Sequence, residues 1–315
     1  MGQQGADRDK VSWKHNFAKV RYNMIPTLNT VTAGGGLPLD QYIALAKRHG
    51  FSGVEFNIDA VADLVAKQSF ETVASLFDSV KVLPAASGLP TEWRRDEETY
   101  RADLAKLPAL AKLSQDLDCS RWCTWVMPAT DEPASEYGAR SIARFAEIGR
   151  ILTDNGIRLG LEFLGPKHLR PNPDNVWFYD IPGALNVVEE IQTIGKLENM
   201  GLLVDCWHWY TSGGSVMDLA SIPLEQIVHV HINDAPDVPR EEQIDNVRLL
   251  PGATGVIDIT GFLKTLSALG YDGPISVETF SADLNAMPAE EAAALAGAAV
   301  AGVFKAAGVE PMRLV

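Results

Sequence analysis

The amino-acid sequence predicts an α/β fold, a (β/α)8 TIM barrel that forms a single domain. Short apolar runs alternate with amphipathic stretches along almost the whole chain, and eight of these runs have the length of strands. Each run is nearly continuous in apolar residues, which is typical of parallel strands covered on both faces. We expect a polar lead over residues 1–20 and the barrel over residues 21–315, since α/β barrels often exceed about 200 residues as one domain.

The eight predicted strands are separated by stretches that leave room for helices. The strands are Met24–Asn29, Gly53–Ile58, Lys81–Ala86, Arg121–Met127, Ile157–Phe163, Gly201–Cys206, Ile227–Ile232 and Ile275–Thr279. Leu39–His49, after the first strand, has apolar residues at helical spacing. Gly50, Gly156 and Gly270 follow three such helices, where a left-handed residue often ends a helix. The alanine-rich stretch Ala289–Ala307 is the expected last helix.

The longest predicted loops follow the fifth and the seventh strand. They are Pro166–Asp180 and Asn233–Ile257, and loops at the C-terminal ends of barrel strands are where substrate walls are built. A doubly wound open sheet is the rival fold. It is disfavoured because Gly34-Gly35-Gly36 lacks the spacing of a phosphate-binding fingerprint after the first strand.

The composition argues against several classes of protein. With 46% hydrophobic and 22% charged residues, the chain is typical of a soluble globular protein. The formal net charge of −14 argues against a nucleic-acid partner, since a phosphate backbone attracts clustered Lys and Arg. No apolar run approaches the roughly 18 residues of a membrane span, and no signal peptide is evident. We therefore expect a cytoplasmic protein without a membrane partner. Three cysteines, an odd and low number, argue against a disulfide framework.

Residues with metal-binding side chains stand at the ends of four predicted strands in the second half of the chain. These residues are Glu162, Asp205, His231 and Glu278. In a parallel barrel the C-terminal ends of the strands meet at one mouth. An unpaired carboxylate after an apolar strand costs on the order of several kcal/mol, so its burial requires a partner. The set predicts a divalent-metal site and therefore a metalloenzyme.

The donor set also indicates the ion and the reaction. Three carboxylates and one imidazole are mostly hard oxygen ligands, which favour Mn2+, with Mg2+, Co2+ or Zn2+ as alternatives. A cation polarises a carbonyl and acidifies its α-carbon, so we expect Glu162 and Glu278 to be a catalytic acid/base pair acting through an enediolate. His229 lies two residues before His231 and points to the same face of its strand, which suits a supporting or packing role.

Other side chains near the strand ends are candidates for substrate contacts. His208, just beyond the sixth strand, and Lys167 and His168, on the loop after the fifth, would donate to a substrate oxygen or remain solvated. Exposed aromatics such as Trp122 and Trp125 would fit a subunit contact or a pocket wall equally well.

Five segments between Leu159 and Phe280 carry a family likeness. They are Gly-Leu-Glu162-Phe-Leu-Gly, Gly-Leu-Leu-Val-Asp205-Cys-Trp-His208, Val-His-Val-His231-Ile-Asn-Asp234, Arg248-Leu-Leu-Pro-Gly-Ala-Thr-Gly-Val-Ile-Asp258 and Gly-Tyr-Asp-Gly-Pro-Ile-Ser-Val-Glu278. On these segments the chain resembles the sugar phosphate isomerase/epimerase superfamily of xylose isomerase-like TIM barrels. Within it, the chain looks most like the inosose isomerase branch, which acts on 2-keto-myo-inositol.

The resemblance implies roles for individual residues. The implied metal ligands are Glu162, Asp205, His231 and Glu278, with Glu162 and Glu278 also as the acid/base pair. It further implies that His208 binds substrate, that Asp234 supports the site from behind the ligands, and that Arg248 belongs to a loop that closes over the pocket. One position departs from the pattern, because the ketose epimerases have an arginine where this chain has Asp237. That departure disfavours a simple ketohexose 3-epimerase.

The sequence therefore predicts a divalent-metal-dependent isomerase or epimerase of a keto-sugar or keto-inositol, with the oligomeric state left open. A dehydratase or lyase of a keto-inositol or 3-keto-glycoside is the alternative, if a leaving group lies β to the acidified carbon. For that alternative, Trp177, Phe178 and Tyr179 would form a wall for the aglycone or else pack within their loop. A metal-dependent endonuclease is disfavoured by the net charge, and a non-catalytic sugar-binding barrel is the remaining class.

Overall fold

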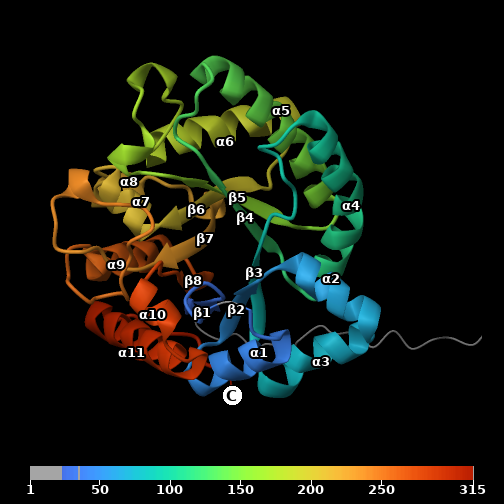
Figure 1. Ribbon diagram of the computed structural model, residues 1–315, viewed down its shortest axis with the longest axis vertical. Helices are drawn as coiled ribbons and strands as arrows, with labels where there is room; N and C mark the ends of the chain where they lie inside the picture. The colour runs from blue at the N-terminus through green and yellow to red at the C-terminus, as the bar shows by residue number, and fades with distance from the viewer. Residues whose placement is uncertain (1–22, 35, 315) are drawn as a thin grey trace, which may run out of the picture.

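The computed structural model describes residues 23–34 and 36–314, which form a closed barrel of eight parallel strands. The strands lie in chain order around the barrel, and the first pairs with the last. Helices surround the barrel on the outside (Figure 1). The predicted (β/α)8 TIM barrel is confirmed. The polar lead predicted for residues 1–20 lies outside the described residues.

The strands and helices alternate as expected, with extra short helices after some strands. The strands are β1 (Ile25–Asn29), β2 (Gly53–Phe56), β3 (Leu83–Gly88), β4 (Arg121–Val126), β5 (Arg158–Phe163), β6 (Met200–Asp205), β7 (Ile227–Ile232) and β8 (Pro274–Val277). The α-helices are α1 (Leu39–Arg48), α2 (Ile58–Lys67), α3 (Phe70–Val80), α4 (Glu97–Asp116), α5 (Ala134–Thr153), α6 (Ile181–Gly195), α7 (Cys206–Thr211), α8 (Val216–Ala220), α9 (Ile259–Leu269), α10 (Ala282–Ala286) and α11 (Ala289–Ala307). The 3-10 helices are η1 (Lys167–Leu169), η2 (Pro173–Asn175), η3 (Leu224–Gln226) and η4 (Arg240–Glu242).

Seven of the eight strands differ from their predicted bounds by one or two residues at one end or both, and only β7 has the predicted bounds. In β2 and β3 a neighbouring helix takes the residues. β2 ends at Phe56, since Asn57 is the N-cap of α2 and its side chain accepts two backbone N–H groups of that helix. β3 begins at Leu83 rather than at Lys81. Lys81 has a φ of 57° and, as a left-handed residue, ends α3. The strand then continues to Gly88, two residues beyond the predicted end.

The helix signals in the sequence are confirmed for the first and the last α-helix and for three helix ends. α1 covers the predicted helix up to Arg48, and α11 has the predicted bounds. Gly50, Gly156 and Gly270 have φ values of 82°, 67° and 86°. A residue with a Cβ adopts this left-handed conformation at a cost, so glycine suits each of these helix ends.

The two tryptophans of β4 face opposite sides of the barrel wall. Trp122 is buried outside the barrel, where its indole N–H donates to Ser114 Oγ at 2.9 Å. The prediction that Trp122 is exposed is therefore wrong. Trp125, three residues later, points to the other face and is 44% exposed.

The register of the strands places the polar residues near their C-terminal ends at a similar height in the barrel. Trp125 of β4 lies opposite Glu162 of β5, and Asp205 of β6 lies opposite His231 of β7. His231 in turn lies opposite Ser276 of β8, two residues before Glu278. Register partners in a parallel sheet point to the same side, so these side chains enter the same mouth of the barrel.

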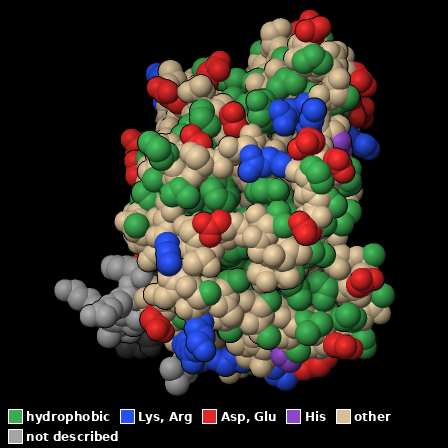
Figure 2. Space-filling model, turned by 90° about the vertical axis from the view of Figure 1, so that its left-hand side faces the viewer, with side chains coloured by type: hydrophobic (Ala, Val, Ile, Leu, Met, Phe, Trp, Pro, Cys, Tyr) green, Lys and Arg blue, Asp and Glu red, His purple; other side chains and the backbone are tan. Residues whose placement is uncertain are grey.

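The surface of the described residues carries mixed charges. Figure 2 shows Lys and Arg side chains scattered among Asp and Glu on the flank of the barrel that lies at the left of Figure 1. That flank offers no extended basic face of the kind a phosphate backbone would bind. Among the described helices, none is both long and apolar enough to cross a membrane.

Candidate metal centre

Four predicted ligands, Glu162, Asp205, His231 and Glu278, converge at the mouth of the barrel. One ligand-type atom from each lies within 4.8 Å of the others. His231 Nδ1 is 3.3 Å from Glu278 Oε2, 3.8 Å from Glu162 Oε1 and 3.9 Å from Asp205 Oδ2. Asp205 is the last residue of β6, whereas the other three stand within one residue of the ends of β5, β7 and β8.

Two atoms of this cluster are buried without a hydrogen-bond partner. They are Glu162 Oε1 and His231 Nδ1, and the distance of 3.8 Å between them is too long for a hydrogen bond. A buried polar atom without a partner costs about 1–3 kcal/mol, unless something else binds it. Carboxylate oxygens and an imidazole nitrogen are good ligands for a divalent cation. The residues present therefore fit such an ion.

The charges in the cluster act on its carboxylates unequally. Burial raises the pKa of Glu162 well above its usual value, and the charge of Glu278 raises it further. Burial also raises the pKa of Asp205, although Arg248 and His231 oppose the change. For Glu278, burial raises the pKa, but His231 and Arg248 outweigh it and the net shift is downward. The site thus pairs a carboxyl that favours its proton with one that favours its charge.

Arg248 is the positive side chain that lies among these carboxylates. Its Nη1 donates to Asp205 Oδ2 and to Glu278 Oε2, each at 2.8 Å, and its Nη2 donates to Asp245 Oδ1 at 2.9 Å. Burial lowers the pKa of the guanidinium, but Asp205 and Glu278 outweigh it and the pKa is raised. The contacts of Arg248 neutralise two of the four candidate ligands, and its predicted role in substrate binding stays a prediction.

His208, the predicted substrate-binding histidine, is buried in the first turn of α7, at the same mouth of the barrel. The backbone N–H of Gly165 donates to its Nδ1 at 3.2 Å. Burial, and then the charge of Arg248, lower its pKa well below the usual value. A neutral imidazole that accepts at Nδ1 carries its proton on Nε2, which is 3.8 Å from Glu162 Oε1 and 3.1 Å from Arg248 Nη2. Arg248 is always a donor, so in this tautomer the 3.1 Å contact joins two N–H groups and is not a hydrogen bond, and an acceptor on a ligand in the mouth would pair with both.

Glu55 is the residue of this centre that the sequence analysis missed. It reaches across the barrel from β2, and its Oε2 is 3.0 Å from His229 Nε2 and 3.0 Å from His231 Nε2. Burial raises the pKa of Glu55, but the two histidines outweigh it and hold the pKa well below its usual value. The signal was present in Gly53–Phe56, where one carboxylate stands inside an otherwise apolar strand.

Two further residues that the sequence analysis missed, Asn29 and Asp245, belong to the surroundings. Asn29, at the end of β1, donates its side-chain N–H to Glu278 Oε1 at 3.4 Å. Asp245, in the loop after β7, binds Arg248 and lies 3.8 Å from His208 Nε2. The sequence alone gives no reason to select one amide at the end of a strand, or one of several acidic residues in a loop, as part of a site.

Two predicted residues, Asp234 and His168, bind loops instead of the cluster. The side chain of Asp234 accepts the backbone N–H groups of Ala235, Thr254, Gly255 and Ile257, so it fastens the loop after β7. His168, exposed in η1, donates through Nδ1 to the carbonyl of Gln243 at 3.2 Å. Their predicted roles, support of the ligands and substrate binding, stay predictions.

The loop after β5 and the cysteine after Asp205 mainly serve packing. Phe178 is buried, and Trp177 packs edge-on against it and against Tyr137, which favours the packing interpretation of this loop. Cys206 Sγ lies 3.2 Å from Asn233 Oδ1, and it is absent from the two groups of candidate ligands among the described residues.

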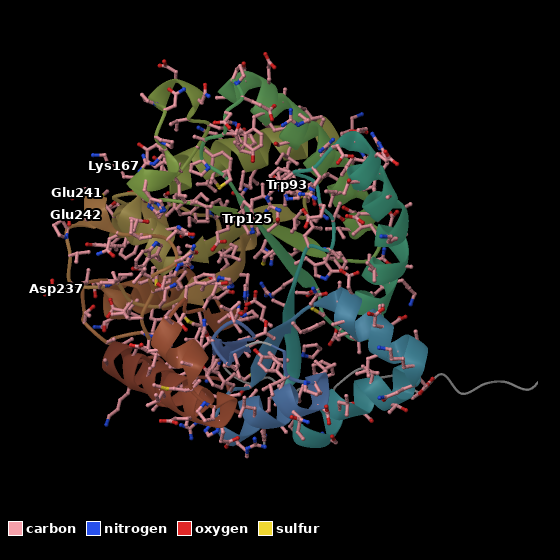
Figure 3. The ribbon with its side chains drawn as sticks, in the orientation of Figure 1. Trp93, Trp125, Lys167, Asp237, Glu241 and Glu242 are labelled. Atoms are coloured by element: carbon pink, nitrogen blue, oxygen red, sulfur yellow. The ribbon has the colours of Figure 1, made fainter. Side chains whose placement is uncertain are left out.

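The mouth has an aromatic side and a charged side. Trp93 and Trp125 lie together near the middle of the barrel in Figure 3, and the Arg94 guanidinium stacks 3.4 Å from the centre of the Trp125 ring. Burial lowers the pKa of Arg94 to about 10. Lys167, Asp237, Glu241 and Glu242 lie at the rim, on the loops after β5 and β7 (Figure 3).

The barrel and its polar mouth agree with what a family comparison finds. A family model described as a xylose isomerase-like TIM barrel matches residues 43–301. The chain belongs to this family. The sequence resemblance to xylose isomerase-like barrels is therefore confirmed.

Curated relatives share this fold family and differ in the reaction that their names give. The inosose isomerase of Halalkalibacterium halodurans is 24% identical over 278 residues, which cover 87% of this chain and 92% of that protein. The 3-dehydroshikimate dehydratase of Pseudomonas aeruginosa is 36% identical over 92 residues, which cover 29% of this chain and 14% of that protein.

Solved structures of xylose isomerase-like proteins match nearly the whole described barrel. A xylose isomerase domain protein from Alicyclobacillus acidocaldarius has a TM-score of 0.81 at 29% identity, covering 90% of this chain and 99% of its own. The structure of the IolI protein with a bound zinc atom has a TM-score of 0.76 at 21% identity, covering 92% of this chain and 100% of its own. At 21% identity the second likeness establishes the fold alone.

Proposed function

We propose that the protein is a divalent-metal-dependent isomerase or epimerase of a keto-sugar or keto-inositol. The observation that carries the proposal is the convergence of Glu162, Asp205, His231 and Glu278, two of whose buried ligand atoms have no hydrogen-bond partner. The mostly oxygen donor set favours Mn2+, and the zinc named for one structural neighbour makes Zn2+ the main alternative. Similarity to an inosose isomerase over most of the chain supports a cyclic ketone as substrate.

Glu162 and Glu278 are the proposed proton-transfer pair. When bound, a divalent cation polarises a carbonyl group and makes the neighbouring C–H more acidic. One of the two carboxylates removes that proton and the other returns it at the adjacent carbon or on the opposite face, through an enediolate. Both side chains lie within 4 Å of His231 Nδ1, at 3.8 Å and 3.3 Å, so they would face the same small substrate.

Two buried donors would stabilise the charge that develops on the substrate. His208 carries its proton on Nε2 when Nδ1 accepts from Gly165, and Arg248 Nη2 lies 3.1 Å away. Donors that are already oriented towards a developing negative charge lower the barrier more than solvent does. We propose that these two groups bind substrate oxygens, while Trp125 offers its exposed ring to the apolar face of a sugar or cyclitol.

The proposal is tested by proton exchange in D2O. Wild type, Glu162→Gln and Glu278→Gln are loaded with Mn2+ or Zn2+ and incubated with 2-keto-myo-inositol or a ketohexose. After metal removal, NMR measures deuterium in the recovered substrate and product. We expect deuterium at the carbon next to the carbonyl with wild type. We expect each variant to be slower by about 10²–10⁴, the usual contribution of a general acid or base.

A glutamate outside the barrel mouth provides the matched control. Glu189 is exposed on α6, so Glu189→Gln should exchange at the rate of wild type. Deuterium incorporation that persists unchanged in both Glu162→Gln and Glu278→Gln would rule out this acid/base pair. Tight metal binding without any exchange, with a range of keto-sugars and cyclitols, would favour a non-catalytic sugar-binding barrel.

A dehydratase or lyase is the second candidate, and a specific observation favours it. The local identity of 36% to a 3-dehydroshikimate dehydratase exceeds the identity to the isomerases, although it covers under a third of the chain. The same carboxylate pair would then remove a proton and protonate a leaving group on the β-carbon. Incubation with 3-dehydroshikimate or a 3-keto-glucoside separates the two reactions, because elimination gives an absorbing conjugated product or a free aglycone.

A further inference from the structure

Glu55 connects two histidines of β7 across the interior of the barrel. Its Oε2 is 3.0 Å from His229 Nε2 and 3.0 Å from His231 Nε2, and its Oε1 is 3.3 Å from the latter. The two imidazole rings are buried and stand nearly perpendicular, at 84°. β2, which carries Glu55, is separated from β7 by β8 and β1 in the barrel. The contact is therefore a tertiary one that only the closed barrel provides.

The Glu55 carboxylate determines which nitrogen of His231 carries the proton, because, when ionised, it can only accept hydrogen bonds. An ionised carboxylate accepts hydrogen bonds and donates none. Both imidazoles must therefore direct an N–H group from Nε2 towards Glu55. A neutral imidazole has one N–H, so His231 then has its lone pair on Nδ1. Nδ1 is the atom that lies 3.3–3.9 Å from Glu278, Glu162 and Asp205 and that has no hydrogen-bond partner.

We propose that Glu55 is a positioning residue that holds His231 with its proton on Nε2 and presents Nδ1 to the cation. His229 supplies a second N–H to the same carboxylate and fixes the orientation of Glu55. Partners of this kind set both the protonated nitrogen and the ring orientation of a ligand histidine. The inference rests on the proposed function, because it takes His231 as a ligand of the metal.

A second cation bound by Glu55, His229 and His231 is the competing interpretation, since their ligand-type atoms also lie within 4.8 Å of one another. That arrangement would place metals on both nitrogens of His231 and would require the ring to lose its last proton. The distances of 3.0 Å already provide hydrogen bonds for the Nε2 atom of each histidine and for the Glu55 carboxylate without that loss. The two interpretations differ in the number of ions and in the proton on Nε2.

The first test reads the proton directly in the wild-type protein. The chain has six histidines, so nitrogen-15 NMR of the zinc-loaded protein can resolve them, with His231→Asn used to assign the signal. We expect a metal-bound Nδ1 and a protonated Nε2 for His231. A metal-bound Nε2, or a ring without any N–H, would overturn the proposal, and so would two zinc ions per chain in wild type.

The second test measures metal affinity in the Glu55→Gln variant. The amide oxygen can still accept from His231 Nε2, but the amide lacks the negative charge and places an N–H2 group where Oε1 lies, 3.3 Å from that atom, so the favourable form of the ligand is weakened. We expect zinc affinity, from competition with a chromophoric chelator, to fall by about 10- to 100-fold, with the NMR signal of His231 changed. Glu189→Gln should leave both unchanged. Unaltered zinc affinity in a folded Glu55→Gln protein would contradict the inference.

These measurements separate a failure of the inference from a failure of the proposed function. If wild type binds one zinc ion and His231→Asn binds it weakly, but Glu55→Gln equals wild type, only the role of Glu55 is wrong. If wild type binds no zinc, or if His231→Asn binds it as tightly as wild type does, then the ligand assignment itself is wrong. The NMR measurement needs no Glu55 variant, so it decides the point even where Glu55→Gln fails to fold.

Discussion

At the scale of single residues, the mouth of the barrel concentrates buried charge. Glu162, Asp205 and Glu278 are within 4.8 Å of one another through their ligand atoms, and buried carboxylates repel each other strongly at such distances. Arg248 and His231 offset part of that repulsion. The raised pKa of Glu162 relieves a further part, since a protonated carboxyl carries no charge. Positive charge in the cluster stabilises the arrangement, which links the stability of the protein to Arg248 and to a bound cation.

Replacing Arg248 tests this link. We expect Arg248→Gln to lower the free energy of unfolding of the metal-free protein by about 3 kcal/mol, because one partner of a buried ion pair is removed. Added Mn2+ or Zn2+ should raise the melting temperature of the variant more than that of wild type, since the ion takes over the lost charge. Urea unfolding with and without metal measures both effects. Arg150→Gln, on α5, is the control and should behave like wild type.

The sequence predicted the charged residues of this site better than their partners. Glu162, Asp205, His231 and Glu278 each follow an apolar run, and a carboxylate or imidazole there is conspicuous. Glu55 was missed although it also stands in a strand, because its partners come from β7 across the barrel and no local pattern connects them. The same holds for Asn29 and Asp245, which acquire their roles only through the fold.

At the scale of elements, the position of α7 depends on a glycine in the loop after β5. A Cβ on Gly165 would lie 2.3 Å from the carbonyl oxygen of His208 and 2.6 Å from Ser212 N. The backbone N–H of Gly165 also donates to His208 Nδ1. The close approach of loop and helix therefore sets the direction in which His208 presents its Nε2.

Substituting this glycine should disturb stability and activity together. Gly165→Ala forces α7 away from the loop, and we expect a loss of about 1–3 kcal/mol, the usual effect of overpacking, with slower turnover because His208 moves. Gly302→Ala is the matched control, since nothing lies within 4 Å of its new Cβ on the exposed face of α11. That substitution should stabilise the protein by about 0.5–1 kcal/mol through helix propensity. Equal unfolding curves for Gly165→Ala and wild type would contradict this prediction, because they would mean that the loop moves away from α7 without a loss of stability.

The order and type of the elements were predictable, whereas several of their ends were not. Apolar runs and left-handed glycines located the strands and the helix ends, because both signals are local. β3 starts two residues late because Lys81 takes a left-handed conformation that no sequence signal announces for lysine. Trp122 was predicted to be exposed because an indole at a strand position gives no indication of whether α4 covers it.

At the scale of the whole molecule, the candidate metal centre connects four neighbouring strands, which make up half of the barrel. Its four residues belong to β5, β6, β7 and the end of β8, which are consecutive neighbours in the closed sheet. β8 also pairs with β1, and Glu55 reaches back from β2 to β7. A cation bound by these residues would therefore resist separation of the strands as well as carry out chemistry.

Metal should accordingly raise the stability of the entire barrel. A ligand that binds only the folded state stabilises it by about 2.7 kcal/mol at a free concentration 100 times its dissociation constant, which for a domain of this size corresponds to a rise in melting temperature of about 4–5 °C. Differential scanning calorimetry of the wild-type protein after chelator treatment, and then with added Mn2+ or Zn2+, measures the shift. His231→Asn should show little of it and Glu189→Gln all of it, because only the first substitution removes a ligand. A shift of the same size in His231→Asn would place the stabilising ion elsewhere in the protein.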